Sequence, residues 1–244
     1  GRDGVAMFDA LIADAGHHEK RFTVYAADDT SAVEARFGDT GISIDHRPLP
    51  PHGPEPFVVI YDGGDFAGAL SLGDFEELLV PPVVRPGDRG SISAGYRALF
   101  DVLDDTVFSS LDRRQLLGAS REIEDRAFRV GHGVLRVSFQ RFSAFDAQTD
   151  VYRQLAGKAG LDVHVYGSAP DRDPPDIDGL TYHTSTDPSV ERYWALAFDG
   201  GVNEQQACGL LAREHGDAYT GFWTYDPEIV GTILDELESL DEDA

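Results

Sequence analysis

A line of polar side chains follows one side of the helix that we predict after Asp112, and it could bind a ligand or a partner. Residues three, four and seven apart lie on the same side of an α-helix. The members of this line are Gln115, Glu122, Arg126 and Arg129. An ordinary helix gives the same pattern when Glu122 and Arg126, four residues apart, close an ion pair. The sequence therefore leaves open both a recognition surface and a stabilised helix shoulder.

Aromatic side chains gather in the strands predicted toward the end of the chain. Trp194 opens one of them, and Trp223 lies on one face of another together with Tyr219 and Tyr225. Such a face could line an apolar ligand pocket, although the core of a sheet is its more common place. We take Trp194 and Trp223 as further candidates for ligand or partner binding.

Catalytic and metal-binding motifs are absent from the sequence. It contains no Gly-x-Ser-x-Gly elbow, no P-loop and no dinucleotide fingerprint, and its eight histidines show no metal-ligand spacing on a recognisable helix. Dispersed carboxylates and a histidine, for example Glu122, Glu124 and His132, could still serve a small-molecule enzyme. We assign no catalytic residue, no metal ligand and no cofactor.

The helix that carries the polar line has clear start and stop signals. Asp112 is the expected N-cap, Gln115 completes a capping box, and Gly131 ends the helix. A strand at 134–140 follows. We expect the segment of roughly 91–147 to hold two helices and a strand.

The segments on either side of this one share a pattern. Val24-Tyr25-Ala26 returns as Val165-Tyr166-Gly167, and Asp62-Gly63-Gly64 returns as Asp199-Gly200-Gly201. The spacing between matching positions drifts only by small steps in loops, as an ancient duplication would leave it.

These observations predict an α/β (α+β) fold with internally duplicated helix-plus-β-sheet units and a helical insert between the copies. We expect a single domain over residues 8–244. Its parts are repeat 1 at about 8–80, the insert at about 91–147 and repeat 2 at about 148–240. Residues 1–7 are interpreted as an N-terminal extension or a tag remnant.

The charge balance is strongly acidic. Aspartate and glutamate number 44 against 20 lysines and arginines, which gives a net charge of −24, and only Lys20 and Lys158 are lysines. Carboxylates hold water and ions, whereas long lysine stems expose methylene surface. This composition favours an extreme halophile with a salt-filled cytoplasm.

Composition also limits the partners. The chain has no basic patch with interleaved aromatic residues, so we expect no direct contact with nucleic acid. Cys208 is the single cysteine, which excludes an intrachain disulfide. No apolar run is long enough to cross a membrane and no signal peptide is evident, so we expect a cytoplasmic protein.

Several segments resemble the DICT sensory domain family, and the stand-alone haloarchaeal form in particular. The similar segments are 103–108, 112–117, 120–127, 139–141, 162–167 and 221–227. The family takes its name from its association with diguanylate cyclases and two-component systems, which implies signal input rather than catalysis. The resemblance supplies no catalytic or ligand-binding residues to transfer to this sequence.

The resemblance and the missing catalytic motifs favour a cytoplasmic, non-catalytic sensory protein that binds a small ligand or a protein partner. The sequence carries no recognisable kinase, cyclase or DNA-binding output. We therefore expect the signal to pass in trans to a partner of a signalling pathway, a kinase or a transcription regulator. A homo-oligomer remains open, and the alternative is a small-molecule enzyme with a dispersed carboxylate and histidine site.

Overall fold

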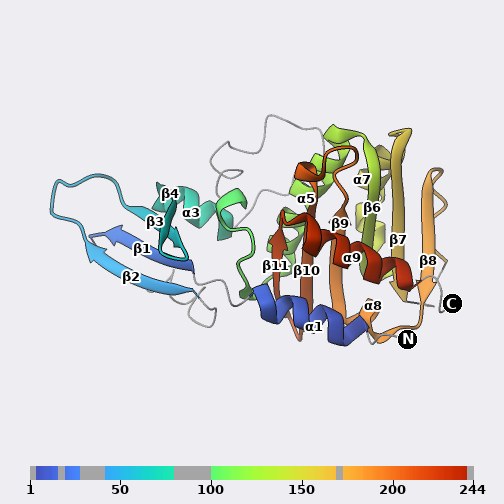
Figure 1. Ribbon diagram of the computed structural model, residues 1–244, viewed down its shortest axis with the longest axis horizontal. Helices are drawn as coiled ribbons and strands as arrows, with labels where there is room; N and C mark the ends of the chain where they lie inside the picture. The colour runs from blue at the N-terminus through green and yellow to red at the C-terminus, as the bar shows by residue number, and fades with distance from the viewer. Residues whose placement is uncertain (1–3, 16–19, 28–41, 80–99, 169–172, 241–244) are drawn as a thin grey trace.

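The computed structural model describes residues 4–15, 20–27, 42–79, 100–168 and 173–240, and it contains two mixed β-sheets (Figure 1). The small sheet has the order β2-β1-β3-β4, and the large sheet has the order β5-β11-β10-β9-β6-β7-β8. The strands of the small sheet are β1 (Lys20–Ala26), β2 (Ser43–Pro48), β3 (Phe57–Asp62) and β4 (Asp65–Ser71). Those of the large sheet are β5 (Phe108–Leu111), β6 (His132–Arg141), β7 (Gly160–Ser168), β8 (Leu180–Ser185), β9 (Tyr193–Phe198), β10 (Cys208–His215) and β11 (Ala218–Thr224).

Helices cover both faces of the large sheet. In Figure 1, α9 and α1 cross its front, while α5 and α7 lie behind it. The helices are α1 (Gly4–Ala15), α3 (Leu72–Leu79), α5 (Arg113–Val130), α6 (Phe142–Phe145), α7 (Thr149–Ala156), α8 (Pro188–Arg192) and α9 (Pro227–Ser239), with short 3-10 turns at Asp146–Gln148 and Glu204–Gln206. Because both faces are covered, all six residues of β9 are buried and apolar. The predicted α/β class is confirmed.

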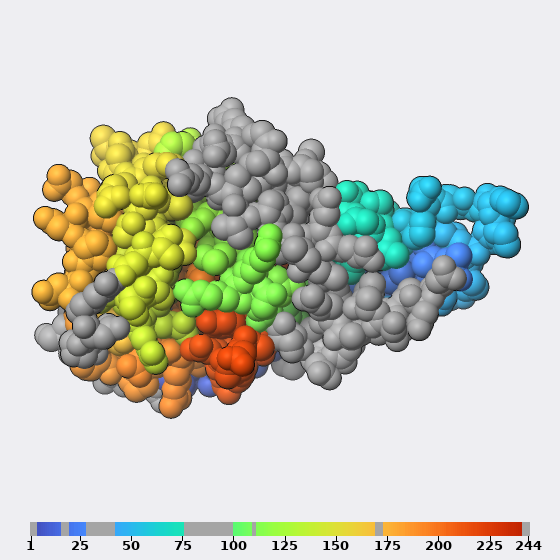
Figure 2. Space-filling view, turned by 180° about the vertical axis from the view of Figure 1, so that it is seen from behind, coloured from blue at the N-terminus to red at the C-terminus, as the bar shows by residue number. Residues whose placement is uncertain are grey.

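The small sheet projects from one end of this larger body (Figures 1 and 2). One of its faces is apolar, with Phe22 and Val24 of β1 packed against Phe75 of α3. These residues belong to the same hydrophobic cluster as Leu103 and Leu135 beside and within the large sheet. The two sheets therefore share one continuous core. No helix in the described ranges combines the length and the apolar character needed to cross a membrane.

Helix α1 includes part of the predicted N-terminal extension. Residues 4–7 form its first turn, and their interpretation as an extension or a tag remnant stays a prediction. The Tyr193 hydroxyl donates to the Val5 carbonyl (3.2 Å) and to Asp9 Oδ1 (2.7 Å), which fixes this turn against β9.

The two predicted repeats differ in their elements and in their packing. Among the described residues, α1 and β1–β4 have their counterparts in α7 and β7–β10, but α8 and a 3-10 turn stand between strands of the second set. Strand β1 pairs directly with β3, whereas β6 separates β7 from β9. Helix α1 also packs on the large sheet, away from the strands of its own repeat. The duplication itself stays a prediction.

The predicted insert is part of the large sheet. Its strand β6 pairs in parallel with β7 and antiparallel with β9, and β5, an unpredicted strand, pairs with β11. The first of the two helices predicted in this segment, at 94–103 in the sequence, begins outside the described residues. The segment is thus built into the core of the larger body.

Candidate functional site

Helix α5 has the ends that its sequence predicts. Asp112 Oδ1 accepts from the Gln115 backbone amide (2.8 Å), and Gln115 Oε1 accepts from the Asp112 amide (2.9 Å). Gly131 ends the helix in the left-handed conformation with a φ of 71°. The side-chain oxygen of Gln115 is therefore used in the capping box.

The other members of the polar line have partners within the protein, and the ion pairs differ from the predicted one between Glu122 and Arg126. Glu122 is only 3% exposed, and its Oε1 lies 3.9 Å from Arg129 Nη2. Arg129 Nε also lies 2.8 Å from Asp125 Oδ2. These contacts favour a stabilised helix shoulder.

Arg126 turns toward the C-terminal end of β11. Its guanidinium lies 4.2 Å from the centre of the Tyr225 ring, and its Nη2 lies 3.7 Å from Asp101 Oδ1. Two surface clefts, described below, lie at the end of β6 and at the start of α9. None of the four residues of the polar line lines either cleft. A role for them in ligand or partner binding stays a prediction.

The two tryptophans lie in the core. Trp223 stacks against Phe100 and Phe108, with ring centres 4.4 and 4.8 Å apart, and its Nε1 donates to the Phe100 carbonyl at 2.9 Å. Trp194 is buried, with the Arg113 guanidinium 5.4 Å from the centre of its ring. These positions agree with a sheet core, the more common place for such a face.

The carboxylates considered for catalysis have different neighbours. Glu124 is buried and accepts hydrogen bonds from Arg121 and from the Tyr152 hydroxyl, the latter at 2.8 Å. Burial raises the pKa of Tyr152, and the Glu124 carboxylate raises it further. Glu122 faces Arg129 instead. Within the described ranges, no group of three or more His, Cys, Asp or Glu side chains could hold a metal ion.

A cleft of about 340 Å³ lies where β6 ends, and it is the site that the sequence did not reveal. In α/β sheets, ligands commonly bind beyond the carboxyl ends of parallel strands, where neighbouring connections diverge. Here β6 has the parallel strand β7 on one side and the antiparallel strand β9 on the other. The cleft is lined by Arg113, Phe139, Gln140, Arg141, Ser143, Ala144, Glu191 and Glu214.

Gln140 organises the floor of this cleft. It has a φ of 64°, which is uncommon for a residue with a side chain, and it lies in an irregularity of the β6–β7 pairing. Its Nε2 donates to the Glu191 carbonyl (3.2 Å) and to Glu214 Oε2 (2.9 Å). Strained backbone of this kind is found preferentially at functional sites. A glutamine carries no sequence signal of positive φ, so the feature could not be predicted.

Charges of both signs surround the opening. The side chains concerned are Arg113, Arg141, Glu191 and Glu214, all of them exposed. Tyr219 lies beside Arg113 and Glu214, and its pKa is raised by burial first and by the Glu214 carboxylate second. The phenol therefore remains a proton donor at neutral pH.

A second cleft, also of about 340 Å³, lies at the start of α9. Asp199, Glu204 and Glu228 contribute its polar lining, and Val230 and Leu234 contribute apolar surface. Asp199 Oδ1 is already bonded to the amides of Val134 and Gly201. This cleft lacks both a strained residue and a cation, so the β6 cleft is the better candidate site.

The β6 cleft lies within a segment that is similar to a known sensory domain. The model of the DICT family, a sensory domain in diguanylate cyclases and two-component systems, matches residues 97–215, which is slightly less than half of the chain. The resemblance seen in the sequence is confirmed over this segment. No curated protein sequence matches the chain.

Solved structures offer weaker similarities. The polyphosphate kinase of Porphyromonas gingivalis shares 15% identity at a TM-score of 0.38, and the match covers 96% of this chain and 48% of the kinase. The chain thus spans about half the length of that protein. The phosphatidylserine synthase of Haemophilus influenzae Rd KW20 shares 11% identity at a TM-score of 0.22, over 98% of this chain and 84% of the synthase. At these TM-scores neither similarity supports a functional assignment.

Proposed function

We propose that this protein is a non-catalytic sensory protein that binds a small polar ligand in the β6 cleft and passes the signal to another protein. The observation that carries the proposal is the position of the cleft. Every residue that lines it lies within residues 97–215, the segment that matches the sensory domain. The strained Gln140 at its floor supports a site maintained for binding.

The cleft has the size of a ligand site and a more polar lining than most. Pockets for small molecules have volumes of about 300–1,000 Å³ and combine apolar walls with a few polar groups that fix orientation. At about 340 Å³, the β6 cleft falls at the small end of that range. Phe139 and Ala144 supply apolar wall, and Gln140 supplies a polar group.

The signal would leave through a protein of a signalling pathway, a kinase or a transcription regulator, in the cytoplasm. The exposed ends of α5 and α6 border the cleft, so a change in ligand occupancy would alter a surface that such a partner can contact. The residues of the polar line, Gln115 through Arg129, would hold α5 in place during this change.

The proposal is tested by recovering the ligand. The purified protein is incubated at molar potassium chloride with the small-molecule fraction of cytoplasm from its own host, exchanged into ammonium acetate and measured by native mass spectrometry. We expect a bound species on the wild type and on Arg153→Ala, a control variant at an exposed position of α7, but not on Arg141→Ala. No bound species, or a species that Arg141→Ala retains, contradicts the proposal.

A further inference from the structure

The charged side chains of the β6 cleft do not pair with one another. Arg113 and Arg141 lie on the same cleft as Glu191 and Glu214, yet none of these four forms an ion pair with another described residue within 4.0 Å. Acidic residues outnumber basic ones by 44 to 20 in this chain, so partners for arginine are abundant. Among the described residues the two arginines thus have no carboxylate partner, and Arg113 contacts Trp194 and Tyr219 instead.

The positive side of the cleft is held in place. The Arg113 guanidinium lies over the Trp194 ring at 5.4 Å, an arrangement that fixes a cation by its attraction to the ring face. Arg113 is also the first residue of the 18-residue helix α5, where the helix dipole adds positive potential. Arg141 ends β6, directly after the strained Gln140. A planar guanidinium forms two parallel hydrogen bonds with a carboxylate, which favours that group as the ligand's anionic end.

The negative side is positioned by one buried residue. Gln140 is 8% exposed, and its amide nitrogen bonds to the Glu191 carbonyl and to the Glu214 carboxylate. It thereby holds the end of α8 and the end of β10 at fixed positions on the cleft. The carboxylates of Glu191 and Glu214 are both exposed on the cleft, so an ammonium group bound there can reach their oxygen atoms.

We infer that the ligand of the β6 cleft is a small zwitterion, a molecule of amino-acid type that carries one carboxylate and one ammonium group. This inference rests on the proposed function, since it takes the cleft as the signal site. A ligand with a single charge would pair either with the two arginines or with the two glutamates of the cleft, and it would leave the other pair without a partner. A ligand with both charges pairs with the arginines and with the glutamates. The small volume of the cleft limits this ligand to about the size of an amino acid.

High salt sharpens this selection. At molar salt the Debye length is about 3 Å, so charges act on the ligand mainly through direct contact. A ligand is then recognised by the hydrogen-bonded pairs it forms, and each charge-assisted pair lost weakens binding by about tenfold or more.

The test is calorimetric titration of the whole chain at molar potassium chloride with a series of ω-amino acids from glycine to 6-aminohexanoate. Each is compared with the carboxylate and the ammonium ion of the same chain length, for example γ-aminobutyrate with butyrate and butylammonium. We expect at least one amino acid to bind at least about tenfold more tightly than both matched ions.

Variants assign the two ends. Arg141→Ala and Glu191→Ala should each weaken binding of that amino acid by about tenfold, while Arg153→Ala and Glu228→Ala should leave it unchanged. All four positions are exposed, and far-ultraviolet circular dichroism verifies that the variants are folded.

Other outcomes overturn the inference in distinguishable ways. If a matched carboxylate or ammonium ion binds as tightly as the amino acid, if the two cleft variants bind normally, or if no amino acid binds, the zwitterion is wrong. The proposed function is still supported if the small-molecule fraction of the host contains a species that binds the wild type but not Arg141→Ala. If that fraction contains no such species, both the zwitterion and the proposed function are wrong.

Discussion

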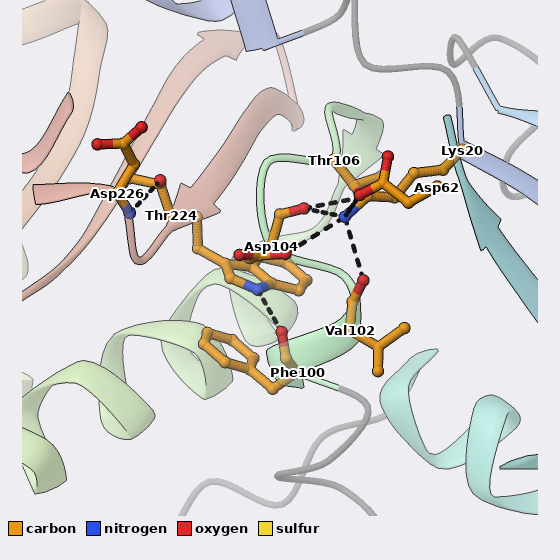
Figure 3. Close-up of polar contacts among 9 residues, drawn as sticks. Lys20, Asp62, Phe100, Val102, Asp104, Thr106, Thr224 and Asp226 are labelled. Atoms are coloured by element: carbon orange, nitrogen blue, oxygen red, sulfur yellow. Dashed lines mark hydrogen bonds and ion pairs between the residues drawn. The ribbon is translucent and has the colours of Figure 1, made fainter. Parts of the chain in front are cut away.

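Lys20 is one of only two lysines in the chain, and it is 2% exposed. Its ammonium group donates to the carbonyls of Val102 (3.1 Å) and Asp104, and it lies 3.3 Å from the Asp104 carboxylate and 3.8 Å from that of Asp62 (Figure 3). A buried charge is tolerated only with such partners. Lys20 thus ties β1 of the small sheet to the segment that leads into the large one.

Replacing Lys20 should loosen this connection. Lys20→Met removes the charge and leaves the carbonyl of Val102 and the carboxylate of Asp104 without their donor, so we expect a loss of about 3 kcal/mol in the free energy of unfolding. The matched control is Lys158→Met, where the ammonium lies 3.8 Å from the centre of the Phe128 ring and a loss below about 1 kcal/mol is expected. Urea unfolding at constant molar salt measures both. Equal losses in the two variants would show that Lys20 does not hold the sheets together.

The backbone strain at Gln140 can be tested by comparing the stabilities of its alanine and glycine variants. Gln140→Ala removes two hydrogen bonds and keeps the unfavourable φ of 64°, whereas Gln140→Gly removes the same bonds and relieves the φ. At ordinary positions alanine is more stable than glycine. Here we expect the glycine variant to be more stable by about 1 kcal/mol, as measured by urea unfolding. An alanine variant of equal or greater stability would mean that the backbone at this position is unstrained.

At the scale of elements, the sequence predicted the parts whose signals are local. Asp112, Gln115 and Gly131 act within a few residues of one another, so α5 could be placed to within a residue at each end. Local signals also act at α9, where Asp226 is the N-cap. Asp62-Gly63-Gly64 forms the turn between β3 and β4, with φ of 55° and 97° at its glycines.

Positions that depend on distant partners could not be predicted. Strand β6 is central because Leu135 lies between Val163 of β7 and Phe198 of β9, and no local pattern specifies those neighbours. The candidate site has the same origin, since Arg113, Gln140 and Glu214 come from three elements far apart in the chain. The polar line on α5 was visible in the sequence because it is local, but its partners were not.

Helix α1 gives a prediction for acid conditions. Asp9 Oδ1 accepts from Tyr193 (2.7 Å) and lies 2.8 Å from Arg213 Nη1. Burial acts to raise the pKa of Asp9, but the bonds from Tyr193 and Arg213 outweigh it and hold the pKa below the ordinary 3.8. A carboxyl with a lowered pKa contributes stability above its ordinary pKa and loses it as pH falls through the folded value.

The stabilising contribution of Asp9 should therefore persist from neutral pH down to about its ordinary pKa of 3.8 and disappear only below it. Asp9→Asn should be less stable than the wild type by under about 1 kcal/mol, because the side chains of Asp9 and Arg213 are 41% and 42% exposed. Hydrogen exchange of α1 amides, measured from neutral to acid pH in both proteins, reports the difference. A gap that closes already between pH 7 and pH 5 would contradict this linkage.

At the scale of the whole molecule, the feature to explain is a net charge of −24 on a folded chain of 244 residues. Carboxylates outnumber the basic groups in this chain. In the interior, the carboxylate of Glu124 is bonded to Arg121 and Tyr152. Repulsion among surface carboxylates opposes the compact state. The folded chain thus combines paired charges in its interior with a surface that repels itself at low salt.

Salt should therefore stabilise this protein through the molar range. Raising the ionic strength from about 0.15 M to about 1 M shortens the Debye length from about 8 Å to about 3 Å, which removes most repulsion between neighbouring carboxylates. We expect the Tm to rise continuously with potassium chloride, and to rise less with sorbitol at equal osmolality, which excludes volume without screening charge. Substituting exposed acidic residues on α9, such as Asp235→Asn with Glu228→Gln, should reduce the slope of Tm against salt, since fewer carboxylates remain to be screened. A Tm that stays flat or falls with added potassium chloride would show that the acidic surface is not an adaptation to salt.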